Sequence, residues 1–106
     1  MMIDWSPVDL QGHLDAGQAV FLKLWKKGCG ACKLSIPAIE RIEAGYTGQV
    51  IFGQICTDDH PEMLEVSGSE ALPSFFVFKD RQQKGQFTGF KGLEKLRGFV
   101  AESLAR

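Results

Sequence analysis

The sequence lacks any long hydrophobic run and any block of basic residues. No apolar stretch approaches the roughly 20 residues that a membrane-spanning helix needs. Its 12 basic and 13 acidic side chains leave a net charge of −1, which gives no electrostatic case for nucleic acid or an anionic membrane. The first residues lack a positively charged start followed by an apolar core, so we expect no secretory signal and a cytoplasmic location.

Cysteine is scarce, and its number is odd. The three cysteines are Cys29, Cys32 and Cys56, which argues against a framework of structural disulfides. A hydrophobic fraction of 44% in 106 residues is sufficient for a chain of this size to fold without such staples. We therefore expect one domain over residues 1–106, in which the close pair of cysteines is either catalytic or metal-binding.

Hydrophobic patterning predicts helices that alternate with buried strands. A helix should start at Pro7 with Ser6 as its N-cap, and the second helix should bury Leu34, Ala38 and Ile42. The further elements are expected as strands over 19–25, 50–56, 74–78 and 85–88, and helices over 29–44, 58–67 and 93–104. Strands joined through helices pair in parallel by right-handed crossovers, and the last two strands form an antiparallel hairpin. The pattern predicts an α/β fold with a mixed sheet of four to five strands and helices on both faces.

Cys29 and Cys32 fall where a buried strand turns into a helix. The first N–H groups of a helix have no intrahelical partner, and the helix dipole favours a negative charge there. A thiol at this position is stabilised as the thiolate, which is the nucleophile in disulfide exchange. Cys32 is one helical turn further on, so it can attack a mixed disulfide formed on Cys29.

A Cys-x-x-Cys motif alone is a weak signal, because zinc sites also use it. Zinc sites usually need a second pair of cysteines, or histidines at metal-binding spacing. The remaining candidates are Cys56, His13 and His60, which stand apart in the sequence on different elements. We therefore expect no metal, and we expect Cys56 to be a small buried side chain.

Residues 25–33, Trp-Lys-Lys-Gly-Cys-Gly-Ala-Cys-Lys, resemble the active-site segment of thioredoxins, usually written W-x-x-W-C-G-P-C-K. The resemblance extends over nearly the whole chain. Further matching positions are Pro37 inside the helix, Asp58 and Pro61, the segment Leu72-Pro73-Ser74, the turn Lys79-Asp80, and Gly89. The resemblance implies a thioredoxin fold and a thiol–disulfide oxidoreductase that needs no cofactor.

The resemblance assigns roles to the matching positions. Cys29 would be the exposed attacking thiolate and Cys32 the more buried resolving thiol. Pro73 would follow a cis peptide bond that places the backbone of Leu72 beside the cysteines, where it pairs with an extended client segment. The implied substrate groove consists of Trp25, Gly28, Gly30, Leu72, Pro73, Gly89 and Phe90. Trp25 would shield the thiols, and the alternative is a core residue at the end of a strand.

Four positions depart from the family pattern. Lys23 stands where thioredoxins usually carry a buried aspartate, and Gln54 stands where they carry a lysine. Gly28 replaces the second tryptophan, and Ala31 replaces the proline between the cysteines. If its ammonium lies near the cysteines, Lys23 is a candidate for tuning their pKa by charge. The alternative is that Lys23 lies near a sheet edge and extends its ammonium to water. These changes predict a reduction potential away from the strongly reducing family norm.

Two classes of function remain. The leading interpretation is a specialised thioredoxin-like enzyme that cleaves disulfides in client proteins and is re-reduced by a thioredoxin-reductase-type donor. A glutaredoxin-like protein is disfavoured, because the segment around Pro73 lacks the usual threonine-valine-proline. The alternative is a binding or chaperone-like module that uses the groove at Leu72, Pro73, Gly89 and Phe90 for docking.

Overall fold

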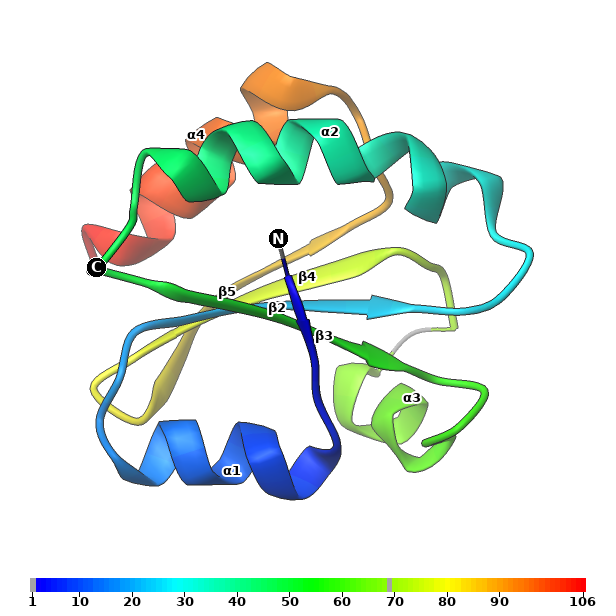
Figure 1. Cartoon of the computed structure of the whole chain (residues 1–106), viewed down its shortest axis with the longest axis horizontal. Coiled ribbons are helices and arrows are strands. Elements are labelled where there is room, and N and C mark those ends of the chain that lie inside the picture. The colour runs from blue at the N-terminus through cyan, green and yellow to red at the C-terminus, as the bar shows by residue number, and fades with distance from the viewer. Residues whose placement is uncertain (1, 69) are drawn as a thin grey trace.

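The computed structural model describes residues 2–68 and 70–106. Within them a five-stranded sheet has the strand order β1-β3-β2-β4-β5 (Figure 1). The strands are β1 (Ile3–Asp4), β2 (Val20–Trp25), β3 (Ile51–Cys56), β4 (Ser74–Lys79) and β5 (Gln82–Thr88). The helices are α1 (Pro7–Asp15), α2 (Gly30–Ala44), α3 (Glu62–Ser67) and α4 (Leu93–Leu104).

The sheet is mixed, as the sequence predicts. Strands β1, β3 and β2 are parallel neighbours, whereas β4 is antiparallel to β2 and β5 is antiparallel to β4. The two central parallel strands end together, because Trp25 is the partner of Cys56 in their register. The segments that follow these two strands therefore meet at one edge of the molecule.

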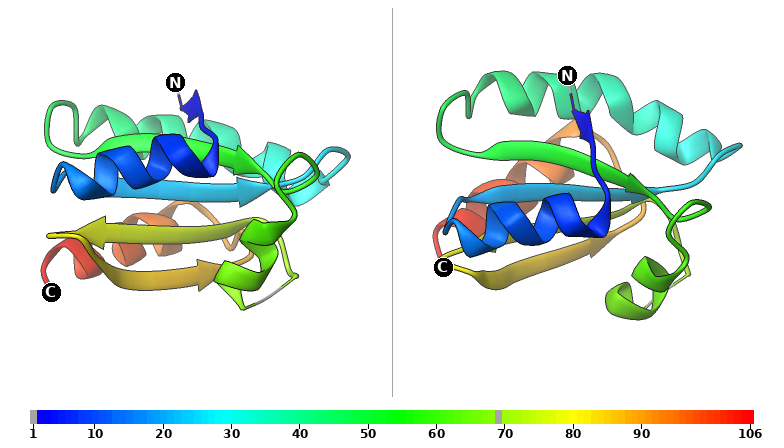
Figure 2. Two further views of the ribbon diagram at one scale, coloured as in Figure 1. Left: turned by 90° about the horizontal axis from the view of Figure 1, so that it is seen from below. Right: turned by 60° about the horizontal axis from the view of Figure 1, so that its bottom comes forward.

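Helices cover both faces of the sheet. Figures 1 and 2 show α2 and α4 on one face and α1 and α3 on the other. Successive side chains of a strand point to opposite faces, and β2 illustrates the result: Phe21 is part of the core cluster on the α2 and α4 side, and Leu22 of the cluster on the α1 and α3 side. By the same alternation Lys23 lies on the α2 side.

The start of α1 is as predicted. Ser6 is its N-cap and forms a capping box, in which Asp9 N donates to Ser6 Oγ at 3.2 Å and Ser6 N donates to Asp9 Oδ2 at 2.9 Å. Pro7 occupies the first helical position. These bonds satisfy N–H groups that the helix itself leaves unpaired.

Some elements differ from the sequence prediction, and strand β5 begins at Gln82 instead of residue 85. Strand β1 was not foreseen, and the third helix begins at Glu62 instead of residue 58. Pro61 accounts for the late start, since a proline disfavours helical geometry in the residue before it.

The buried face of α2 also differs. Leu34 is 71% exposed, whereas Ser35 is buried together with Ala38, Ile39 and Ile42. Ser35 lies one helical turn before Ile39 and shares its face, while Leu34 is offset from it by more than a quarter of a turn. The Ser35 hydroxyl is satisfied in the core because it donates to the carbonyl oxygen of Cys32 at 2.7 Å.

Helix length and composition also bear on membranes. Within residues 2–68 and 70–106, no helix has the length and apolar character that crossing a bilayer requires.

Candidate active site

Cys29 is the N-cap of α2. Its backbone is extended, with φ −89° and ψ 108°, and the helix begins at the next residue. The N–H of Cys32 donates to Cys29 Sγ at 3.1 Å. One of the free N–H groups at the helix start is therefore aimed at the sulfur of Cys29, where it stabilises a negative charge.

Cys29 and Cys32 are joined by a disulfide, with 5.2 Å between their Cα atoms. Cys29 ends the loop that joins β2 to α2, and this loop leaves the sheet at the edge where β2 and β3 end (Figure 1). Cys29 is the more accessible of the two, with 9% exposure against 2% for Cys32. An approaching reagent therefore meets Cys29 first.

The Leu72–Pro73 segment lies on one side of Cys29. The peptide bond between these residues is cis, and the carbonyl oxygen of Leu72 is 3.9 Å from Cys29 Sγ. The carbonyl oxygen of Pro73 accepts a hydrogen bond of 2.7 Å from the N–H of Gly89. Gly89 has a φ of +83°, which favours glycine. The structure thus brings Leu72, Pro73 and Gly89 together beside Cys29.

Other predicted groove residues lie elsewhere around the cysteines. Trp25 and Gly28 line a pocket that also contacts both sulfur-bearing residues. Gly30 is exposed as the first residue of α2. Phe90 is partly buried and packs against the core cluster beneath α2 and α4.

Lys23 is buried beneath the cysteines. Its strand β2 is central in the sheet and the residue is only 2% exposed, so its head does not extend to water at a sheet edge. Its Nζ donates to the carbonyl oxygen of Cys32 at 2.8 Å. Burial lowers the pKa of Lys23 from 10.5 to about 8, because the charged ammonium loses its hydration.

The pocket has a volume of about 170 Å³ and lies between β2, β3 and the start of α2. Its lining contains three lysines and the two cysteines, with Trp25 and Ile36 as its large hydrophobic side chains. The full lining is Lys23, Trp25, Lys26, Gly28, Cys29, Cys32, Lys33, Ile36 and Gln54. The side chain that lies beside Lys23 on β3 is neutral, because its register partner there is Gln54.

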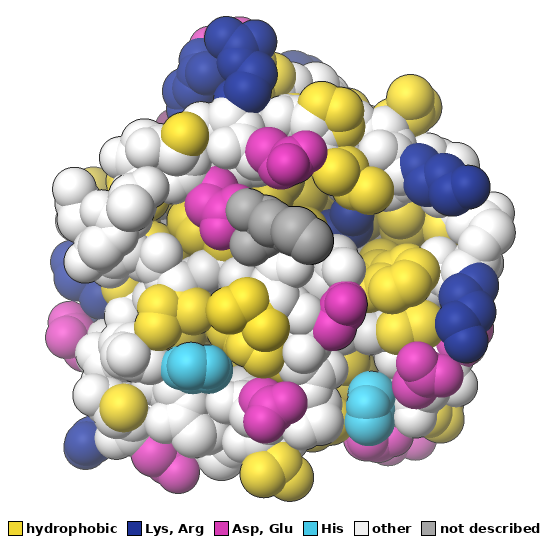
Figure 3. Space-filling model, viewed as in Figure 1, with side chains coloured by type: hydrophobic (Ala, Val, Ile, Leu, Met, Phe, Trp, Pro, Cys, Tyr) yellow, Lys and Arg dark blue, Asp and Glu magenta, His cyan; other side chains and the backbone are white. Residues whose placement is uncertain are grey.

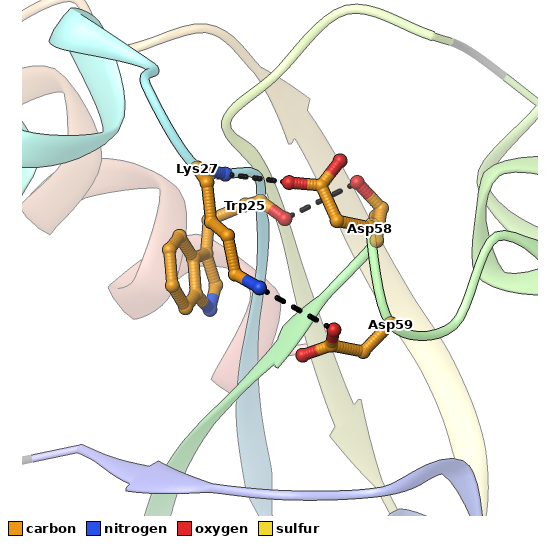
Figure 4. A network of polar contacts seen from close by, with 5 residues as sticks. Trp25, Lys27, Asp58 and Asp59 are labelled. Carbon is orange, nitrogen blue, oxygen red and sulfur yellow. Dashed lines mark hydrogen bonds and ion pairs between the residues drawn. The ribbon is translucent and has the colours of Figure 1, made fainter.

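The turn after β3 holds the loop that carries Cys29 (Figure 4). The carboxylate of Asp58 accepts a 3.0 Å hydrogen bond from the backbone N–H of Lys27, and the Lys27 ammonium lies 3.6 Å from Asp59 Oδ1. Thr57 donates its N–H and its hydroxyl to the carbonyl oxygen of Trp25, at 2.8 and 3.2 Å. Asp58 is among the positions that match the family pattern in the sequence, whereas Thr57 and Asp59 are not. The signal for them was the common end of two parallel neighbouring strands.

Cys56 ends β3 and is buried and free. It lies beside Trp25 in the sheet register, on the strand that follows the active-site helix. The expectation of a small buried side chain is confirmed.

Comparison with known proteins gives a family. The thioredoxin family model matches residues 9–102. A thioredoxin of Chlamydia caviae is 31% identical over 77 residues, covering 73% of this chain and 74% of that protein. An H-type thioredoxin of Chlamydomonas reinhardtii is 34% identical over 77 residues, covering 73% of this chain and 67% of that protein. A thioredoxin of Alicyclobacillus acidocaldarius is 23% identical over 99 residues, covering 93% of this chain and 94% of that protein.

A solved structure shares the fold. It comes from work on the thiol-resolving mechanism of yeast mitochondrial 1-Cys peroxiredoxin through the glutathione and thioredoxin systems. The TM-score is 0.84 at 18% identity, and the match covers 95% of this chain and 94% of that chain. Fold, cysteine pair and relatives agree, and the chain therefore belongs to the thioredoxin family of disulfide oxidoreductases.

Proposed function

We propose that the chain exchanges disulfides with client proteins, with Cys29 as the attacking sulfur and Cys32 as the resolving sulfur. The observation that carries this assignment is the hydrogen bond of 3.1 Å from the N–H of Cys32 to Cys29 Sγ. It favours the thiolate at Cys29 once the disulfide is reduced. The greater exposure of Cys29 supports the same order of roles.

The exchange takes two steps. The Cys29 thiolate attacks one sulfur of a client disulfide, that S–S bond breaks, and the departing client sulfur takes up a proton. The thiol of Cys32 then loses its proton and attacks Cys29 Sγ. The mixed disulfide breaks, the second client sulfur leaves as a thiol, and the Cys29–Cys32 disulfide forms. The protein pair gives two electrons to the client, and a thioredoxin-reductase-type donor then supplies two further electrons that reduce the Cys29–Cys32 disulfide again.

The client lies along the backbone of Leu72 in this proposal. The Leu72 carbonyl, 3.9 Å from Cys29 Sγ, stands where an extended segment carrying the disulfide can pair with it. Pro73 and Gly89 hold this segment through their 2.7 Å hydrogen bond. Gly28 leaves the other side of Cys29 without a side chain, and Trp25, Gly30 and Phe90 complete the proposed groove.

We further propose that the exchange is specialised through a raised reduction potential. The disulfide carries no charge, whereas reduction forms a thiolate at Cys29, which lines the same pocket as the buried ammonium of Lys23. That attraction favours the reduced form. The potential is then higher than the roughly −270 mV of thioredoxin. A redox titration in glutathione buffer checks this: a thioredoxin-like potential, unchanged in Lys23→Met, contradicts the specialisation.

Insulin reduction tests the proposed activity, first with dithiothreitol and then with NADPH and a thioredoxin reductase. We expect turnover that is lost in Cys29→Ser and retained in Cys56→Ser, the matched control on the free cysteine. Absence of turnover in both assays would favour the docking module. Free Cys56 and bacterial relatives support a cytoplasmic site of action, which cell fractionation tests.

A further inference from the structure

The pocket beside the cysteines is positively charged. Lys23 forms its buried wall, while Lys26 and Lys33 are exposed residues on its rim. No aspartate or glutamate lines it within the part of the chain that the structure describes. In the space-filling view, basic side chains stand on either side of a hydrophobic patch at the edge where the loop between β2 and α2 lies (Figure 3).

Nearby acidic side chains are engaged elsewhere. Asp58 and Asp59 bind Lys27, and the carboxylate of Asp4 on β1 accepts a 2.7 Å hydrogen bond from the amide of Gln54. Lys23 has no ion pair with a carboxylate among residues 2–68 and 70–106. Its bond to the carbonyl of Cys32 uses one of the three donors of an ammonium group.

A buried ammonium without a negative partner is unfavourable, because it has lost its hydration and gained no opposite charge. The disulfide state supplies no such charge, since neither sulfur is ionised. A pocket of about 170 Å³ beside Lys23, with Trp25 and Ile36 as apolar walls, has room for a small anion on a short apolar chain.

We propose that this pocket is a carboxylate-binding subsite for small thiol acids, occupied when the Cys29–Cys32 pair is oxidised and vacated when it is reduced. Lys23 holds the carboxylate from below, and Lys26 and Lys33 attract it from the rim. On reduction the Cys29 thiolate, which lines the same pocket, supplies a negative charge for Lys23 and displaces the ligand. The inference rests on the proposed disulfide exchange and adds a class of small-molecule substrate to it.

The reaction of a bound thiol acid balances as follows. Its thiolate attacks Cys29 Sγ, the Cys29–Cys32 bond breaks, and Cys32 leaves as a thiolate beside Lys23. A second thiol-acid thiolate attacks the outer sulfur of the mixed disulfide, which releases the small disulfide and the Cys29 thiolate. Two thiols are oxidised and one protein disulfide is reduced.

Binding of propionate, which has the carboxylate but no thiol, tests the subsite without any redox step. We expect saturable shifts in the NMR spectrum of the oxidised protein at the residues that line the pocket. Affinity should fall roughly tenfold or more on reduction, within the usual range of coupling between two sites. It should also fall as pH rises above about 8, where Lys23 loses its proton. The other charged groups around Lys23 are Lys26 on the loop, Lys33 on α2 and Asp4 on β1, with neutral Gln54 on β3.

Three variants complete the binding test. Lys23→Met should abolish saturable binding, and the double variant Lys26→Gln/Lys33→Gln should weaken it without altering the core. Lys95→Gln, an exposed lysine on α4 that does not line the pocket, should bind propionate like the parent protein. The proposal would be overturned if the NMR shifts of the parent protein do not saturate with propionate, or if Lys23→Met binds propionate with the same affinity as the parent.

A kinetic comparison separates the subsite from disulfide exchange in general. Three thiols are compared: 3-mercaptopropionate, 2-mercaptoethanol and cysteamine. The rate at which each thiol reduces the protein disulfide is divided by the rate at which the same thiol reduces a small reference disulfide. We expect the anionic thiol to be favoured roughly tenfold, and Lys23→Met to remove this preference. Reaction with all three thiols at equal normalised rates would overturn the subsite while leaving the exchange activity intact. Propionate binding in a protein that reduces no insulin would contradict the exchange activity alone.

Discussion

Replacing Lys23 by methionine should stabilise the oxidised protein at neutral pH. Methionine fills a similar volume, so the substitution removes the buried charge and leaves the packing on the α2 side of the sheet largely unchanged. It also removes the hydrogen bond of 2.8 Å from Nζ to the carbonyl oxygen of Cys32. The two effects oppose each other, and their magnitudes decide whether the variant is more or less stable than the parent.

The charge effect is the larger one. Burial lowers the pKa of Lys23 from 10.5 to about 8, and at about 1.4 kcal/mol per pH unit this corresponds to roughly 3 kcal/mol of destabilisation at neutral pH. The lost hydrogen bond is worth about 1 kcal/mol. The variant should therefore gain about 2 kcal/mol in its free energy of unfolding at pH 7.

The pH dependence of stability is an independent check that the buried charge of Lys23 destabilises the folded protein. Below pH 8 the folded and unfolded states both hold the proton, and the full destabilisation is present. Between pH 8 and 10.5 the unfolded chain binds a proton that the folded protein has released, so the stability of the parent rises with pH relative to the variant. The advantage of Lys23→Met should shrink across this window.

Urea unfolding of the disulfide forms at pH 7 and about pH 9.5 measures both effects. Lys33→Met is the control, because Lys33 is exposed on α2 and its substitution should give no pH-dependent difference. The reasoning is refuted if Lys23→Met is less stable than the parent at pH 7, or if the difference between them does not change with pH.

Four further substitutions test the packing and the cap of α1. Gly53→Ala should destabilise by roughly 1–3 kcal/mol, because a Cβ there would overlap the indole ring of Trp5; an unchanged urea midpoint would contradict this contact. Ser6→Ala should lose about 1 kcal/mol with the capping box of α1, and a neutral result in urea unfolding would contradict the cap. Leu34→Ala should change stability by less than about 0.5 kcal/mol, whereas Ile39→Ala should lose roughly 2–5 kcal/mol. Equal losses in thermal or urea unfolding would place Leu34 in the core after all.

Much of the fold could be predicted from local pattern. The helix at Leu93–Leu104 and the start of α1 at Pro7 were predicted at the observed residues, because capping residues and a repeating apolar stripe mark them. Strand β1 could not be predicted, because two residues carry no periodicity. Its pairing beside Gly53 depends on a contact between segments far apart in the sequence.

The part of the site that depends on local sequence pattern was also predictable. Cys29 and Cys32 are recognised from a strand, a glycine turn and a helix that follow one another in the sequence. The environment of Lys23 depends on strand order, because alternation places it on the α2 side of β2 but does not say whether β2 is central or at an edge. The bonds from the turn after β3 to Lys27 likewise depend on two strands ending at one edge.

The rate at which Cys29 is alkylated in the reduced protein tests most directly whether the helix start activates this sulfur. Iodoacetamide labelling at pH 7, located by mass spectrometry, is compared with a peptide of residues 25–33. The bond from the N–H of Cys32 predicts that Cys29 reacts roughly tenfold faster than the peptide cysteine, with Cys32 left unlabelled over the same interval. Equal rates for protein and peptide, or faster labelling of Cys32, would contradict the account.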